Sequence, residues 1–585
     1  MRCRPAVPEL RPFVLLLALT VAAVAQDPSS SPQPIFRSNS ELVLVPAHVM
    51  DHYGRPVHGL KREDFVLKSD GTPQRISVFD EVQPAPLPAK PPAGKVETVS
   101  ASAPQKFSNL PAEGLPQQLV ILAVDMVNTP VMLQGWAKTQ TIKYLSAHPA
   151  QQPLAVVAIT ADGLREVCSF TTDTARLIAS INKLATHLTS QDSQEVLLSS
   201  MDPQGRIDTY TSLVNQLQER NAQQAAGSID AGGATLRSFE QLAWAYSGVP
   251  GRKTVLWLTS GFPIIEEIAD GPTMLGRFSA PNRVLPYSTG RRLNTELLPE
   301  FQRAFTALNK ADVIVYPVDV KGLPTDDMWD ASQPAGLFIH PAQSHLYPLL
   351  PNGAGSTEGM TELAHRTGGK TCTAGNNLQY CLDQALGESS DYYMLGFYVP
   401  EQDRKLGWHK LKVSVNVDHG EVRARSTYYL RPLGAPLKEE QDDDLRSAIH
   451  ADMAYTGIIF NVEPGAKGTG PDAPIVFKIT VPASSVQLLP GEEKLSFDVI
   501  AIPLSRTGTP LGTDARIVNL DIAPGLTQKA LTKGWNLLDF VPRNTSAAAV
   551  KVIVRDNGTG RVGSVVFPLA LEAKAAATAA TLPSK

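Results

Sequence analysis

The chain has 585 residues, with 53 Lys and Arg against 57 Asp and Glu, and a formal net charge of -4 at pH 7. A chain of this length exceeds what one hydrophobic core supports, which predicts two to four domains. So small a charge leaves no basic footprint and excludes proteins that bind nucleic acid through a charged surface.

The N-terminus has the pattern of a processing signal. Three arginines precede the apolar run 13–25, which ends on small residues. This pattern is typical of a signal peptide over residues 1–25, cleaved after Ala25, with an uncleaved anchor as the alternative. No later stretch has the roughly 20 apolar residues of a membrane-spanning helix. We therefore expect a periplasmic or secreted protein with no transmembrane anchor after cleavage.

A small β subdomain is expected over residues 39–83. It contains short apolar runs separated by turn residues such as Ser69-Asp70-Gly71. Segments 26–38 and 84–117 on either side are rich in Pro, Ser, Ala and Gln, which predicts linkers. About 45 residues is small for an independent domain, so we expect this unit to pack against a neighbour.

Residues 118–432 alternate between apolar strands and helices. Strands are predicted at 119–124, 154–160, 253–259, 312–318 and 392–399, with helices between them. This alternation predicts an α/β domain with a doubly wound, mostly parallel sheet and right-handed crossovers. The hairpin 408–429 would continue or flank that sheet. Two inserts rich in Gly, Pro and aromatic residues, 261–296 and 319–356, are expected to cap its ligand-binding edge.

The C-terminal third changes to short β runs. An acidic stretch at 433–451 is interpreted as a linker, and seven short strands with Pro and Gly between them predict a β-sandwich over 452–571. The Ala- and Thr-rich tail 572–585 is expected to be disordered.

The cysteines fit an oxidising compartment. Cys372 and Cys381 flank a turn-rich stretch, which predicts a disulfide in an exported protein, with a pair of free thiols as the alternative. Cys168 lies in a predicted strand and is expected to be a buried thiol.

Four motifs, taken in order and spacing, carry a family resemblance. In chain order these motifs are Asp51-x-x-Gly54-Arg55-Pro56, Val124-Asp125-x-x-Asn128-Thr129, Gly251-Arg252-Lys253-Thr254 leading to Thr259-Ser260-Gly261, and Thr367-Gly368-Gly369-Lys370 leading to Tyr392-Tyr393-x-Leu395-Gly396-Phe397. Over residues 40–430 the chain resembles the von Willebrand factor A-related proteins typical of acidobacteria. The resemblance implies a von Willebrand A-like α/β fold preceded by the small β subdomain, but names no substrate; the expected C-terminal β-sandwich flanks it on the other side.

The resemblance also implies a metal ion-dependent adhesion site at the carboxyl edge of the sheet. That site combines Asp-x-Ser-x-Ser with a distant Thr and a distant Asp, and Mg²⁺ prefers such hard oxygen ligands. Here the match is degenerate, because Val127 replaces the first Ser. The candidate ligands of Mg²⁺ or Mn²⁺ are Asp125, Thr129, Thr235 and Ser260. Alternatively, Asp125 and Thr129 cap the loop and the following helix through backbone hydrogen bonds.

No catalytic motif accompanies these features. Ser260 lacks the glycine two residues before it that a nucleophile elbow needs, and neither a Walker A lysine nor a dinucleotide fingerprint occurs. We therefore expect no enzyme, but an adhesion module that binds a protein or an extracellular-matrix partner. The alternatives are a structural component of a cell-envelope assembly and a hydrolase with an unfamiliar site.

Overall fold

The structure is a computed structural model of the whole chain. The residues it describes are 41–83, 106–109, 118–150, 152–184, 230–249, 251–262, 288–321, 357–373, 377–400, 404–417, 420–430, 438–465, 473–489, 492–512, 515–544 and 546–569. None of the helices in these ranges is long and apolar enough to cross a membrane.

Two segments far apart in the sequence build the first β unit. Strand β1 (Glu41–Met50) pairs antiparallel with β11 (Tyr392–Val399), placing Val43 opposite Phe397, and with β13 (Glu421–Ala424). The two sheets have the orders β13-β1-β11-β4 and β14-β12-β2-β3 and share one apolar core. The remaining strands are β2 (Phe65–Ser69), β3 (Thr72–Gln74), β4 (Val78–Val82), β12 (Gly407–Val415) and β14 (Thr427–Leu430).

Between these two segments the chain forms a five-stranded sheet of order β10-β9-β6-β7-β8. Its strands are β6 (Gln118–Asp125), β7 (Leu154–Thr160), β8 (Gly163–Thr171), β9 (Arg252–Thr259) and β10 (Val313–Asp319). Four strands are parallel, whereas β8 runs antiparallel to β7. Each parallel strand is buried on both faces, which its continuous apolar sequence requires.

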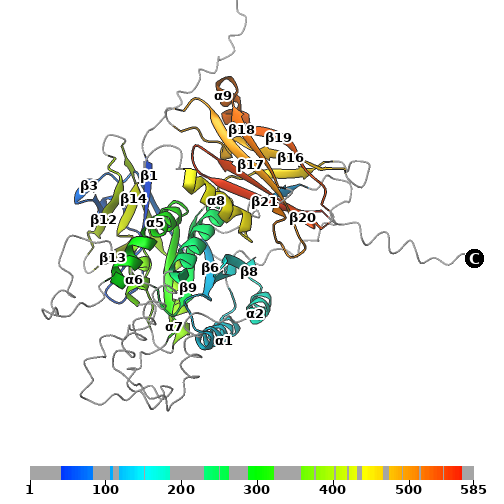
Figure 1. The fold of residues 1–585 in the computed structure, drawn as a ribbon. Coiled ribbons are helices and arrows are strands. Elements are labelled where there is room, and N and C mark those ends of the chain that lie inside the picture. Colours follow the sequence, from blue (N-terminus) through cyan, green and yellow to red (C-terminus); the bar gives the residue numbers. More distant parts are fainter. Residues whose placement is uncertain are drawn as a thin grey trace, which may run out of the picture.

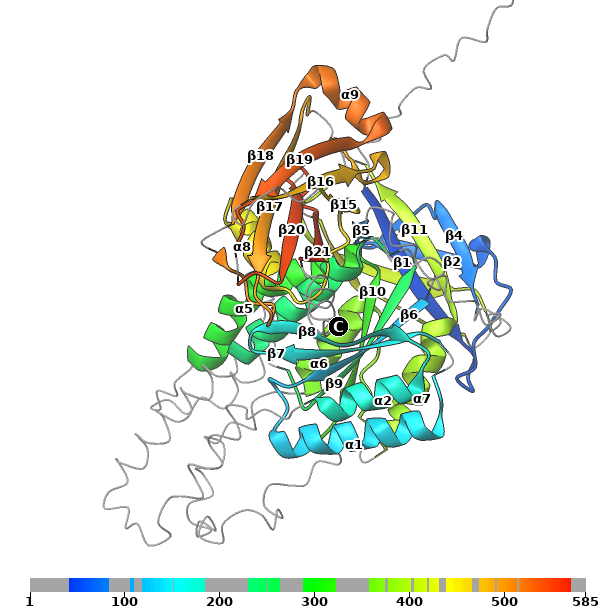
Figure 2. The same cartoon turned by 90° about the vertical axis from the view of Figure 1, so that its right-hand side faces the viewer.

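Helices cover both faces of this sheet. One face packs on α1 (Val131–Ala147), α2 (Thr174–Lys183) and α7 (Leu378–Ser390) (Figure 2). The other packs on a helix at 230–246, on α5 (Ser288–Lys310) and on α6 (Thr357–Thr367).

The C-terminal unit is a two-layer β structure with sheet orders β19-β16-β15-β5 and β18-β17-β20-β21 (Figure 1). Its elements are α8 (Lys438–His450), β15 (Asn461–Pro464), β16 (Ile475–Val481), β17 (Leu495–Leu504), β18 (Arg516–Ile522), α9 (Pro524–Lys533), β19 (Trp535–Val541), β20 (Ala549–Asp556) and β21 (Val562–Pro568). Strand β5 (Phe107–Ser108) comes from the opposite end of the chain and pairs with β15.

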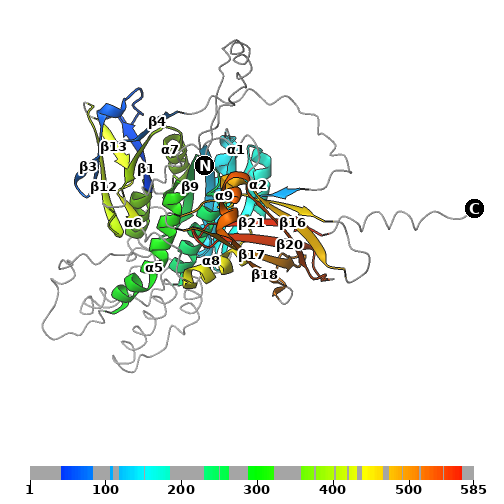
Figure 3. The ribbon, with the colours of Figure 1, turned by 90° about the horizontal axis from the view of Figure 1, so that it is seen from above.

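The C-terminal unit packs against the five-stranded unit (Figure 3). Outward apolar side chains such as Ile500 and Ile553 join the core beneath the helix at 230–246. Gly248 follows that helix, and a Cβ there would lie 2.2 Å from the carbonyl oxygen of Thr456, so only glycine permits this approach. The buried Lys551 of β20 donates to the carbonyl oxygen of Ala451 just after α8, and burial lowers its pKa to about 8.

The predicted fold class is wrong for this chain. Four of the five sheets are antiparallel and the fifth is mixed, so a doubly wound parallel sheet does not describe the molecule. The predicted last strand of the parallel sheet, β11, instead pairs antiparallel with β1, and the hairpin 408–429 divides between the two sheets of the first β unit. Alternation of strands and helices indicates which segments are strands, but it does not indicate which sheet each strand joins.

Three predicted boundaries also differ from the structure. The linker 84–117 contains β5, the linker 433–451 contains α8, and α5 begins at Ser288 inside the predicted insert 261–296. The subdomain 39–83 is half of a unit completed by residues 392–430. Residues 1–40 and 570–585, with the predicted signal peptide and tail, lie outside the described residues.

Candidate functional site

Asp125, the last residue of β6, is the centre of a buried polar network at the carboxyl edge of the five-stranded sheet. Its Oδ1 accepts hydrogen bonds from the backbone N–H groups of Val127 (3.0 Å) and Asn128 (2.9 Å). Its Oδ2 accepts from the Asn128 amide (2.8 Å), from the Trp257 indole (3.1 Å) and from the Thr259 hydroxyl (2.9 Å). One carboxylate therefore fixes the loop after β6 and the end of β9.

Asn128 links this carboxylate to a more distant part of the chain. Its Nδ2 also donates to the hydroxyl of Thr235 (2.8 Å), on the helix at 230–246. That hydroxyl in turn donates to the carbonyl oxygen of Ala231 (3.1 Å). Asn128 thus ties the loop after β6 to a helix that covers the sheet.

Ser260 and Thr129 join the two loops that leave β6 and β9. The hydroxyl of Ser260 donates to the carbonyl oxygen of Asn128 (2.5 Å), and its N–H donates to the Thr129 hydroxyl (3.2 Å). Ser260 and Thr129 are both buried. The two loops are therefore held side by side by hydrogen bonds shielded from water, where such bonds are strongest.

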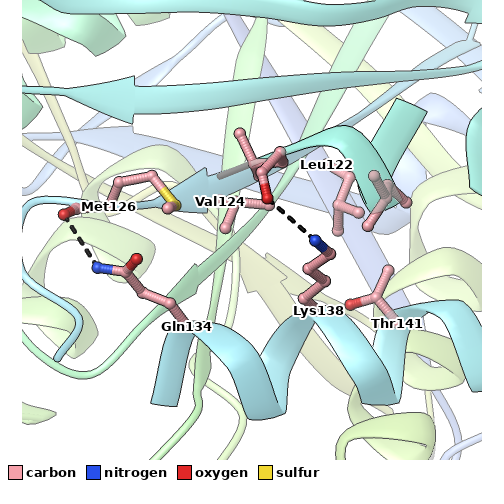
Figure 4. A pocket seen from close by; sticks show the side chains of 8 residues that line it. Leu122, Val124, Met126, Gln134, Lys138 and Thr141 are labelled. Carbon is pink, nitrogen blue, oxygen red and sulfur yellow. Dashed lines mark hydrogen bonds between the residues drawn. The ribbon is translucent and has the colours of Figure 1, made fainter. Parts of the chain in front are cut away.

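Aromatic rings and the side chain of Gln134 hold this network in place. Trp257 lies between Phe239 and Phe262 with edge-to-face ring contacts at 5.1 and 5.6 Å. Gln134 of α1 donates to the carbonyl oxygen of Met126 (3.3 Å), as Figure 4 shows, and also to that of Thr129 (2.6 Å). The loop after β6 is thereby fixed on both sides.

The hollow drawn in Figure 4 lies between β6, α1 and α2. Its lining is mostly apolar, and Lys138 at its margin donates to the carbonyl oxygens of Asn182 (2.8 Å) and Leu184 (3.0 Å) near the end of α2. The lysine therefore caps α2, a structural role suited to the negative end of a helix.

The residues of the predicted metal site converge, but their donor atoms do not fit a metal ion. Mg²⁺ and Mn²⁺ need oxygen lone pairs directed at the ion. The oxygens of Asp125 already accept five hydrogen bonds, and the hydroxyls of Thr129 and Thr235 accept from the Ser260 N–H and the Asn128 amide. Within the described ranges no group of three or more His, Cys, Asp or Glu is placed to hold a metal.

Burial governs the charge of this site. Burial raises the pKa of Asp125, and hydrogen bonds from Asn128, Val127 and Thr259 oppose that rise.

The alternative to a metal site was that Asp125 and Thr129 cap the loop and the following helix. Asp125 does cap its own loop through backbone N–H groups. Thr129 does not cap α1, whose N-cap residue is Pro130; it accepts from Ser260 instead.

Sequence reasoning missed Trp257, Thr259 and Gln134, and it did not predict the hydrogen bonds of the Asn128 side chain. The position of Thr259 at the end of a buried strand beside β6 was an available signal. Cys372 and Cys381 are joined by a disulfide with a Cα–Cα distance of 5.6 Å, and Cys168 is a buried free thiol. Most of the two inserts, 263–287 and 322–356, lies outside the described residues.

Comparisons with known proteins add little. No family model matches the sequence, and no curated protein matches it. The resemblance to von Willebrand factor A-related proteins therefore stays a prediction.

Two solved structures show weak similarity. The pilus adhesin SpaC from Lactobacillus rhamnosus GG matches at 10% identity and a TM-score of 0.23, over 76% of this chain and 54% of its own, so this chain spans about half of that protein. Three N-terminal domains of the type V pili tip protein Mfa5 from Porphyromonas gingivalis match at 9% identity and a TM-score of 0.19, over 90% of this chain and 96% of that one.

Proposed function

We propose that this chain is an exported, non-catalytic binding protein that recognises a protein or matrix partner at the carboxyl edge of the five-stranded sheet. The observation that carries the proposal is the bond pair between Ser260 and the loop 128–129, which locks two neighbouring loops together. Recognition residues usually lie on loops that a rigid scaffold positions. Here buried hydrogen bonds hold the first residues of both loops in place.

Two further observations support this role. The disulfide between Cys372 and Cys381 suits an oxidising compartment outside the cytoplasm. The Ser260 hydroxyl, the nucleophile that an acyl-transfer mechanism would use at this edge, is buried and donates to a carbonyl oxygen. Recognition at this edge would therefore use shape and hydrogen bonds rather than covalent chemistry or a metal ion held by Asp125.

Met132 is a suitable position for a substitution that tests this proposal. It lies in the first turn of α1, directly after the loop that Asp125 fixes, and it is 80% exposed. The full chain would be immobilised, and binding of cell-surface protein extract would be measured as a function of extract concentration. We expect saturable binding that Met132→Lys weakens, and that the matched control Leu406→Lys, at a 60% exposed position near β12, leaves unchanged.

Three results would count against the proposal. Binding that never saturates, or equal loss in both variants, would indicate nonspecific adsorption. Hydrolysis of a chromogenic ester that Ser260→Ala abolishes would instead favour the hydrolase alternative.

A further inference from the structure

Strand β19 is an edge strand of the C-terminal unit with an unusual outward face. Its outward side chains are Asn536, Leu538 and Phe540, of which Leu538 is 72% and Phe540 40% exposed. None of the three carries a charge. The strand thus combines an unpaired edge with apolar side chains, the combination that favours pairing with another strand.

Other edge strands in the described sheets are protected. Natural edges are short, charged, broken by proline or covered by another element. Here β3 and β5 are short. Charged residues lie on four other edge strands: β4 (Asp80, Glu81), β8 (Arg165, Glu166), β13 (Glu421, Arg423) and β18 (Arg516, Asp521). The last three edge strands are contacted by other parts of the chain: β10 by Cys372, β14 by α5 and α6, and β21 by Thr456 and α8. Of the edges that the structure describes, β19 alone is seven residues long and has neither an outward charge nor a cover.

The one charge of β19 is turned inward and neutralised. Asp539 is buried, and its Oδ1 accepts from Nε of Arg516 on β18 at 2.5 Å. The same guanidinium lies 4.2 Å from the ring centre of Phe540. The formal charges at this edge, those of Asp539 and Arg516, are paired with each other, so a second β19 would meet no unpaired charge there, and Phe540 is already held in place by the guanidinium.

We propose that β19 pairs antiparallel with β19 of a second copy of this chain, about a two-fold axis at Leu538. In this register Leu538 faces its own symmetry mate, and Asn536 faces Phe540. Residues directly opposite in such a pair have Cβ atoms about 4.5–5.5 Å apart, so the two leucines make direct contact. The edge-to-edge contact joins two four-stranded sheets into one continuous sheet.

The position of β19 suits this contact. Strands β18 and β19 and helix α9 lie at the end of the molecule away from α1 and α2 (Figures 1 and 2). Dimerisation through β19 would leave the carboxyl edge of the five-stranded sheet accessible. The inference is therefore independent of the proposed function.

Sedimentation velocity of the full chain over about a hundredfold range of concentration tests the proposal. We expect a reversible dimer. Leu538→Lys would place two like charges opposite each other and weaken the dimer at least about tenfold. The matched control is Ile517→Lys on the neighbouring strand β18, at a 66% exposed position, which should leave the dimer intact.

A second variant tests the register. Leu538→Cys should form a disulfide-linked dimer under mild oxidation, because the residue faces itself across the axis. Phe540→Cys should not, because its symmetry mate lies four residues along the strand, roughly 13 Å away.

Three results would overturn the proposal. The first is a monomer at every concentration. The second is a dimer that Leu538→Lys leaves unchanged, or that both lysine variants weaken equally. The third is more efficient cross-linking of Phe540→Cys than of Leu538→Cys. Met132→Lys should not affect the dimer, so its outcome is distinguishable from that of the partner-binding experiment.

Discussion

Asp444 of α8 faces the fully buried Arg555 of β20, with 3.4 Å between Oδ2 and Nη2. The side chain of Asp444 is 13% exposed. Burial raises its pKa to about 6 from an ordinary 3.8, and the attraction of Arg555 and Arg303 offsets only part of that rise. This pair lies where α8 packs on the C-terminal sheet, so its titration should be visible in the stability of the protein.

The direction in which stability changes with pH follows from the direction of the Asp444 pKa shift. Because the folded state holds the Asp444 proton more tightly than the unfolded state does, its contribution to stability is fully present below pH 3.8 and is lost as pH rises through 6. The change from 3.8 to about 6 corresponds to about 3 kcal/mol in the free energy of unfolding. Most of this loss falls between about pH 4 and pH 6.

Urea denaturation of the wild type and of Asp444→Asn, followed by tryptophan fluorescence at several pH values, measures this effect. We expect the stability of the wild type relative to Asp444→Asn to fall by about 3 kcal/mol from about pH 4 to about pH 7. Asp442→Asn, at an exposed position on the same helix, is the matched control and should follow the wild type. A relative stability that rises over this range would show that the ion pair with Arg555 outweighs burial, and would refute the reasoning.

Three further predictions concern buried polar groups. Asp125→Asn should lower the free energy of unfolding by about 2–4 kcal/mol in urea denaturation, because an amide NH₂ would face the donors that the carboxylate accepts; the exposed Asp162→Asn should not. Calorimetric titration with Mg²⁺ or Mn²⁺ should give no heat that Asp125→Ala removes; a heat lost in that variant would contradict the geometry. Asn109→Ala should lower the free energy of unfolding by about 2–4 kcal/mol in the same denaturation assay and expose the chain near β5 to limited proteolysis, because it removes hydrogen bonds to the backbone of Tyr455, Ile458 and Phe460. Unchanged stability and cleavage would show that β5 contributes little to the stability of the C-terminal unit.

Local pattern predicted most individual strands. The expected strands 154–160 and 392–399 coincide with β7 and β11, and the strand expected at 253–259 matches β9 within one residue. These segments are rich in β-branched or aromatic residues and are flanked by Pro or Gly, so the signal lies within each segment and its borders. Helix α9 was missed, because its Pro524-Gly525 start has the composition of a turn.

Long-range pairing was the part that the sequence could not predict. The pairing of Val43 with Phe397 joins residues more than 350 positions apart, and that of Asn461 with Ser108 is equally distant. The run at 107–109 is too short to show a period, so a linker was the natural interpretation. What holds it is Asn109, whose side chain bonds three backbone groups of the C-terminal unit.

The hydrogen bonds of the candidate site also could not be predicted from the sequence. The motifs identified Asp125, Thr129, Thr235 and Ser260, and the structure does bring them together through Asn128. Residue type alone cannot distinguish oxygens that face a ligand from oxygens that face each other. The distinction depends on donors such as Trp257, which lies 132 positions from Asp125 in the sequence.

Counting donors around a buried carboxylate gives a criterion for such sites. An ionised carboxylate offers about four lone-pair positions. Asp125 accepts five hydrogen bonds from neutral donors of the protein itself, so a cation could bind only by displacing at least one of them, such as the Asn128 amide or the Trp257 indole. Each displaced N–H would remain buried and lose this hydrogen bond, at about 1–3 kcal/mol apiece. A site that kept its metal would instead direct at least one free oxygen toward solvent, and the geometry around Asp125 therefore favours a structural role that keeps the loops after β6 and β9 rigid.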